Sequence, residues 1–85
     1  MEPAWLIRPV SVAQAEAANT PRDPPGTPFG LRLGAWRAFI AQMKDGDELW
    51  EFRSPRDSWA KMCGMAGYSL VRRGEIVDSI ILMQN

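Results

Sequence analysis

Residues 68–83 read YSLVRRGEIVDSIILM and decide the fold, because two β-rich runs are joined there by Arg73 and Gly74. If these two residues form a tight loop, the chain folds back and the flanking residues face one another in pairs. The expected pairs are one ion pair and then two apolar pairs: Arg72 with Glu75, Val71 with Ile76, and Leu70 with Val77. The sequence therefore predicts a C-terminal β-hairpin.

Upstream of the hairpin, residues 48–53 alternate in a way that predicts a strand, and residues 55–66 predict a helix. Three start signals precede or open this helix: Ser54 as N-cap, Pro55 at the first helical position and Asp57 at N3. Its apolar stripe has the i, i+3, i+4, i+7 spacing and consists of Trp59, Met62, Cys63 and Ala66. Gly67 is the expected helix stop.

Another helix is predicted before the 48–53 strand. The same helical spacing recurs in Trp36, Phe39, Ile40 and Met43, which would form one buried stripe. The segment Lys44-Asp45-Gly46-Asp47 is the expected end of this helix, because it combines a base with a glycine that tolerates positive φ.

The N-terminal third is less regular. Residues 4–10 predict a short strand that Pro9 confines to an edge, and residues 11–18 predict an alanine-rich helix capped by Ser11. Residues 19–28 hold four of the seven prolines and predict a linker or exposed loop. We therefore expect an N-terminal arm and Pro-rich linker over 1–28 and a compact domain over 29–85.

These elements predict an α+β fold. We expect a small mixed sheet of three to four strands, with two helices packed on one face and the hairpin at the C-terminus. In this arrangement the helix over 55–66 is a right-handed crossover, so strands 48–53 and 68–72 run parallel. The strand over 4–10 would be a fourth member of the sheet.

The composition excludes several chemistries. The 85 residues include no histidine and one cysteine, so histidine-based catalytic and metal sites are impossible within one chain. Asp45-Gly46-Asp47 does not continue into a calcium-loop pattern and is interpreted as a turn. Cys63 lies on an apolar stripe without a base to activate it. We predict no enzymatic activity, no metal and no cofactor.

Charge and hydrophobicity bear on location and partners. Ten basic residues balance ten acidic ones, no apolar run approaches the length of a membrane span, and a single cysteine offers no intrachain disulfide. We therefore expect a cytoplasmic protein with no membrane partner.

The last predicted strand is apolar on both of its faces, and so small a domain has little to cover it. The residues concerned are Ile80, Ile81, Leu82 and Met83. The leading hypothesis is a non-enzymatic module that binds a protein partner, or a second copy of itself, through these four residues.

The alternative is a nucleic-acid-binding domain. Its candidate contacts are the four arginines near the ends of predicted elements: Arg53, Arg56, Arg72 and Arg73. If they converged on one face, they would bind phosphate beside exposed aromatic rings that stack on unpaired bases. Residues 43–52 also resemble the helix–Gly-Asp–aromatic-strand junction of EVE and related PUA-like domains, a resemblance that implies binding of nucleic acids or modified bases. The likeness covers about ten residues of the chain.

Overall fold

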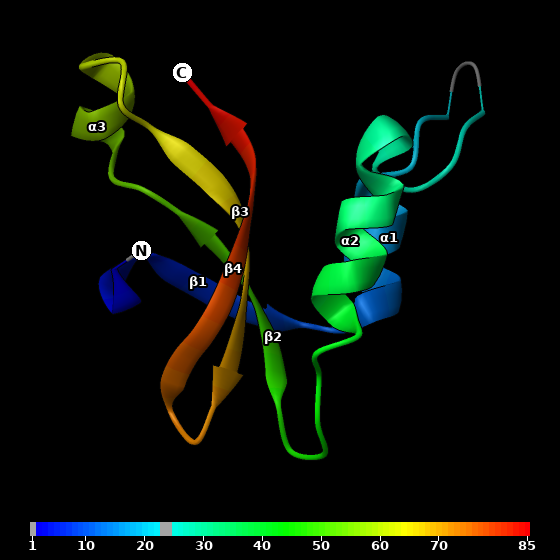
Figure 1. The fold of residues 1–85 in the computed structure, drawn as a ribbon. Helices are drawn as coiled ribbons and strands as arrows, with labels where there is room; N and C mark the ends of the chain where they lie inside the picture. Colours follow the sequence, from blue (N-terminus) through cyan, green and yellow to red (C-terminus); the bar gives the residue numbers. More distant parts are fainter. Residues whose placement is uncertain (1, 23–24) are drawn as a thin grey trace.

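The computed structural model describes residues 2–22 and 25–85, which fold around one four-stranded antiparallel sheet (Figure 1). The strands follow one another in space in the order of the sequence: β1 (Leu6–Val10), β2 (Glu48–Arg53), β3 (Met65–Arg72) and β4 (Glu75–Gln84). The helices are α1 (Val12–Ala18), α2 (Leu33–Ile40) and α3 (Arg56–Ala60), with 3-10 turns at Pro3–Trp5 and Gly30–Arg32. The predicted α+β class and the C-terminal hairpin are confirmed.

The predicted parallel pairing is wrong, because β2 and β3 run antiparallel, with Arg53 opposite Ala66. A crossover between parallel strands needs a long connection, usually a helix. The helix in this connection, α3, has only five residues, and the chain then turns back. Ser54 closes this return. Its backbone N–H donates to the Met65 carbonyl at 2.9 Å, and its Oγ accepts from the Met65 N–H at 2.9 Å.

The helix over 55–66 is therefore shorter than predicted, and its expected stripe does not exist. Pro55 occupies the N-cap position, Met62 has a φ of +62°, and Cys63 is exposed. Gly67 is not a helix stop but lies inside β3, where a Cβ would overlap the Ile80 carbonyl oxygen. Strand pairing with β2 and β4 outweighs the helical signals of this segment.

The hairpin follows the predicted register near its loop and departs from it farther away. Arg73 and Gly74 both have positive φ, at 53° and 80°, as the tight two-residue hairpin turn requires. Arg72 faces Glu75 and Val71 faces Ile76 as predicted, but Leu70 faces Asp78 because Val77 forms a bulge. A second irregularity in β4 falls at Leu82. Arg72 forms its ion pair with Asp47 rather than with the predicted Glu75.

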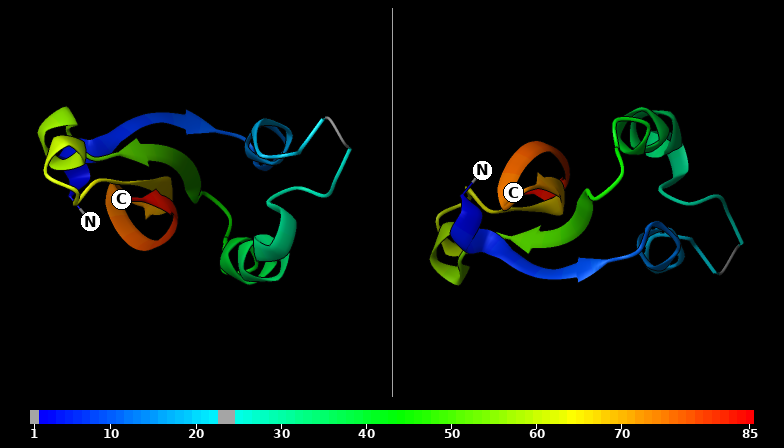
Figure 2. Two further views of the ribbon diagram at one scale, coloured as in Figure 1. Left: turned by 90° about the horizontal axis from the view of Figure 1, so that it is seen from above. Right: turned by 90° about the horizontal axis from the view of Figure 1, so that it is seen from below.

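The core lies between the sheet and two helices, α1 and α2, that stand on the same side of it (Figures 1 and 2). The stripe predicted for residues 36–43 faces the core as expected: Trp36 and Phe39 are buried, while Ile40 and Met43 pack against the core. However, α2 ends at Ile40, before Met43 and before the predicted stop at residues 44–47. Leu49, Tyr68 and Leu70 complete this core from β2 and β3. Side chains alternate across a strand, so Phe52, opposite Gly67, is buried on the other face of the sheet.

The N-terminal segment docks on the rest of the chain. β1 is the fourth strand and pairs antiparallel with β2, from Leu6 opposite Phe52 to Val10 opposite Leu49. Ser11 and Gln14 form a reciprocal capping box that starts α1. Within α1, Ala15 is only 1% exposed and belongs to the core cluster, so the small side chains of this helix allow close approach.

Candidate functional site

The outer edge of the sheet carries the predicted partner-binding residues. Among the described residues, β4 has β3 as its one neighbouring strand, so its other edge is open. Ile80 and Leu82 pack partly against the core, whereas Ile81 and Met83 are 40% and 56% exposed. Val77, also on β4, is 48% exposed. The chain thus covers one half of the predicted apolar set and leaves the other half in solvent.

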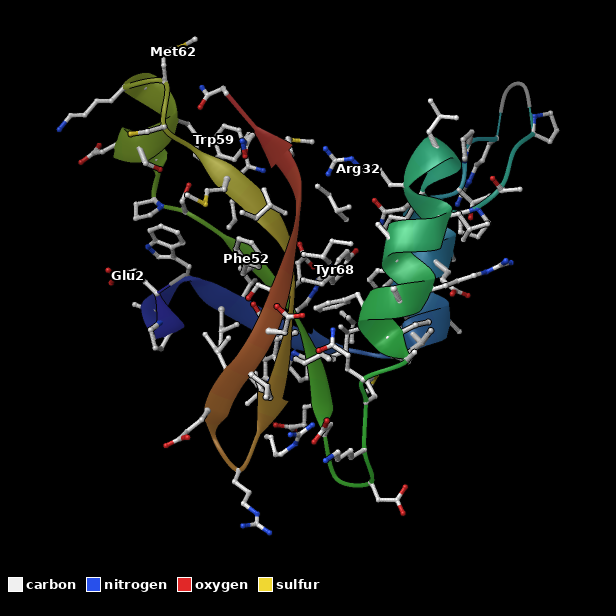
Figure 3. The ribbon with its side chains drawn as sticks, in the orientation of Figure 1. Glu2, Arg32, Phe52, Trp59, Met62 and Tyr68 are labelled. Atoms are coloured by element: carbon white, nitrogen blue, oxygen red, sulfur yellow. The ribbon has the colours of Figure 1, made fainter. Side chains whose placement is uncertain are left out.

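The backbone groups of this open edge are covered by side chains of opposite charge. The Ile80 carbonyl points at β3, against Gly67, so the next carbonyl, that of Ile81, points outward. The Arg32 guanidinium reaches across from the start of α2 and donates through Nη1 to this Ile81 oxygen (Figure 3). The Ser79 N–H, also turned outward, donates to Oδ1 of Asp78 at 2.9 Å. An acidic and a basic residue therefore satisfy two neighbouring edge positions.

Helix α2 lines the same edge. Gln42, just beyond the helix, donates through Nε2 to Oδ2 of Asp78 at 2.7 Å, while Arg32 makes the contact at the other end. Between these two tethers lies an open depression of about 350 Å³, lined among others by Ala35, Ala38 and Ile80. Because the side chains of these two alanines are short, α2 does not cover the neighbouring edge of β4, and the strand edge stays accessible.

The four arginines of the nucleic-acid hypothesis are not brought together. The guanidinium of Arg53 lies 4.5 Å above the Trp59 ring, and Arg56 is nearby as the first residue of α3. Arg72 and Arg73 lie at the other end of the β2–β3 ladder, by the hairpin turn. This placement gives two separate pairs, so the four side chains offer no shared phosphate site.

Arg72 is also engaged in a structural contact. Its Nε and Nη2 donate to the two carboxylate oxygens of Asp47, each at 2.8 Å, and the Lys44 N–H donates to the same carboxylate at 2.9 Å. The hydrogen bonds from Arg72, and next that from Lys44, lower the pKa of Asp47 from 3.8 to about 2. Arg72 thus holds the turn before β2 against the end of β3.

A polar cluster at the centre of the molecule was not found from the sequence. The Tyr68 hydroxyl accepts from Asn19 Nδ2 at 2.9 Å, and the Trp36 Nε1–H donates to Glu16 Oε2 at 3.0 Å. Figure 3 shows Tyr68 between the sheet and α2. Burial raises the pKa of Tyr68, with Asn19 acting in the opposite direction. Asn19 and Tyr68 are 49 positions apart in the chain, so no local pattern links them.

Two shallow depressions flank this cluster and share Glu51 and Tyr68 in their linings. Glu51 accepts from Arg8 Nε at 3.0 Å, with the Arg8 side chain 69% exposed, so this ion pair lies at the surface. The depression next to Met83 has a volume of about 130 Å³, which is small for an organic ligand. These contacts chiefly join β1 and α1 to the sheet.

No known protein family, curated protein or solved structure matches this chain. Within residues 2–22 and 25–85, no three carboxylates or thiols are grouped as metal ligands would be. No helix in the part of the chain that the structure describes has the length and apolarity needed to cross a membrane. The candidate site therefore rests on the geometry of the β4 edge.

Proposed function

We propose that the protein is a non-enzymatic cytoplasmic module that associates with a second copy of itself through the open edge of β4. The observation that carries this proposal is the exposure of Ile81 and Met83 on an unpaired strand edge. From Ser79 to Asn85 this edge has no charged residue and no proline. Charged residues or proline within an edge strand usually prevent pairing, and this stretch has neither. The two charged side chains that contact it, Arg32 and Asp78, come from outside the stretch.

The opposite edge of the sheet provides an internal comparison. β1 has five residues, and they include Arg8 and Pro9, both of which disfavour pairing of an edge strand. β4 has ten residues, and its uncharged end is longer than the whole of β1. A second copy of the chain is therefore expected to pair with β4 and not with β1.

Matched isoleucine substitutions on the two edges test the proposal. Ile81 and Ile7 are 40% and 51% exposed, so lysine is tolerated sterically at both positions. Sedimentation velocity over a range of concentrations should show a monomer–dimer equilibrium for the wild type. We expect Ile81→Lys to weaken dimerisation by at least about tenfold, since it places like charges at a symmetric strand edge, and Ile7→Lys to leave it unchanged.

Two results would contradict the proposal. One is a wild-type chain that stays monomeric at millimolar concentration. The other is the reverse pattern, in which Ile7→Lys abolishes association and Ile81→Lys does not, because this would place the interface on β1. Circular dichroism of both variants checks that each remains folded.

A further inference from the structure

We infer that two copies join their β4 strands antiparallel in a single register centred on Ile80, in which Arg32 of each copy binds Asp78 of the other. This inference rests on the proposed function, because it specifies how the β4 edges meet. It is carried by the two edge groups already described: the Ser79 N–H held by Asp78 and the Ile81 carbonyl held by Arg32.

Symmetry limits the possible registers. A dimer of identical strands side by side in one sheet has its two-fold axis perpendicular to the sheet, and paired residues then point to the same face. Between the irregularities at Val77 and Leu82, the two paired residue numbers must therefore have an even sum, so one residue lies opposite its own copy across the axis. Outward-facing backbone groups must also meet each other, and on β4 those belong to Ser79 and Ile81.

The register centred on Ile80 pairs these two positions with each other. Ser79 of one copy faces Ile81 of the second, so the Ser79 N–H meets the Ile81 carbonyl across the interface. Both residues lie in the regular stretch of β4 between its irregularities at Val77 and Leu82. One arrangement therefore matches the two outward-facing backbone groups.

Neighbouring registers bring like charges together. An axis through Ile81 would place the two Arg32 side chains next to each other, because each contacts its own Ile81 carbonyl. An axis through Ser79 would bring the two Asp78 side chains onto diagonal positions near the axis, since Asp78 is the adjacent residue. The register centred on Ile80 separates both like-charge pairs.

Pairing in this register exchanges hydrogen bonds without losing any. In the single chain, Asp78 accepts from Ser79 and Arg32 donates to Ile81. When the Ser79 N–H bonds the Ile81 carbonyl of the second copy, both side chains are released. Arg32 and Asp78 both lie on the side of the sheet that carries α2, because Asp78 also contacts Gln42. The released guanidinium of one copy is thus next to the released carboxylate of the other, and the two form an ion pair.

Charge reversal tests this contact directly. In a dimer of R32E chains, each introduced glutamate would face Asp78, and in a dimer of D78R chains each introduced arginine would face Arg32. We expect either variant alone to dimerise at least about tenfold more weakly than the wild type, because two like-charge contacts replace two ion pairs. An equimolar mixture of the two variants has opposite charges at both contacts, so it should associate about as tightly as the wild type.

Sedimentation velocity measures the three samples, and native mass spectrometry identifies the mixed dimer. R37E, at an exposed position on α2 away from β4, controls for the change in net charge and should leave association unchanged. A variant that is only misfolded cannot be restored by mixing with another, so restoration separates the contact from a folding defect. Equal association of wild type, R32E and D78R would overturn the register while leaving β4 dimerisation intact. A monomeric wild type would overturn the proposed function itself, and the register with it.

Discussion

At the scale of single residues, Asp47 shows how the tertiary structure chooses among equivalent charges. Arg72 has Glu75 opposite it in the hairpin, yet its guanidinium binds Asp47 with two hydrogen bonds. The Asp47 side chain is 1% exposed and that of Arg72 is 34% exposed. A two-point contact with a shielded carboxylate is stronger than a cross-strand pair in solvent, which explains the choice.

This contact makes the stability depend on acid pH. The pKa of Asp47 is about 2 in the folded chain against an ordinary value of 3.8. A lowered pKa means that the folded state favours the ionised form, so the stabilisation is complete above about pH 4 and is lost as the pH falls toward about 2. Asp47→Asn should therefore unfold at a lower urea concentration than the wild type at pH 7, and this difference should shrink below pH 4.

Asp45→Asn is the matched control, because Asp45 is an exposed carboxylate of the same turn that takes no part in the Arg72 contact. Urea unfolding followed by tryptophan fluorescence at pH 7, 4, 3 and 2.5 measures all three proteins. A constant difference between Asp47→Asn and the wild type across this range would show that the carboxylate charge does not stabilise the fold.

At the scale of elements, Gly67 of β3 explains why the sheet has its observed form. A Cβ at this position would overlap the Ile80 carbonyl of β4, where the pairing shifts from Ala66 opposite Met83 to Gly67 opposite Ile81. The obstacle is a backbone atom and cannot rotate away. Glycine therefore permits the close approach of β3 and β4 at this irregularity.

Gly67→Ala should destabilise the protein by about 1–3 kcal/mol or more, the range for a group forced into a well-packed site. Gly34→Ala is the contrasting change, because Gly34 lies in α2 and a Cβ there would meet no atom within 4 Å. It should stabilise the protein by about 0.5–1 kcal/mol through the higher helix propensity of alanine. The free energies of unfolding in urea compare the two variants, and equal effects would mean that β4 does not approach β3 as described.

The same elements show what the sequence can predict. The stripe of Trp36, Phe39 and Ile40 predicted α2 correctly, because these side chains all face one core. The stripe that includes Trp59 and Met62 has the same spacing, but α3 ends at Ala60 and the chain turns at Met62 with positive φ. The spacing of apolar residues is a local property of the sequence. The segments against which an apolar stripe packs are distant in the sequence. The antiparallel pairing of β2 with β3 and the Asn19–Tyr68 contact were missed for this reason.

At the scale of the whole molecule, the N-terminal segment contributes to the same core as the sheet. The sequence indicates an arm, because the apolar side chains of residues 11–18 are small and a Pro-rich stretch follows them. Glu16 of α1 accepts from the Trp36 indole of α2, and Asn19 donates to Tyr68 of β3. α1 is thereby attached to both α2 and the sheet, although it supplies little hydrophobic area of its own.

Two alanines of α1 test whether this attachment supports the entire fold. Ala15 is 1% exposed and contacts the core, whereas Ala13 is exposed in the first turn of the same helix. Ala15→Asp would bury an unpaired carboxylate and should cost about 3 kcal/mol or more, lowering the unfolding midpoint of the whole protein in one transition. Ala13→Asp should be neutral or slightly stabilising, because a negative charge near a helix N-terminus is favourable. Thermal unfolding followed by near-ultraviolet circular dichroism reports the four tryptophans, all of which lie outside α1: Trp5, Trp36, Trp50 and Trp59. If Ala15→Asp left their transition unchanged, α1 would be a detachable arm whose docking does not stabilise the sheet.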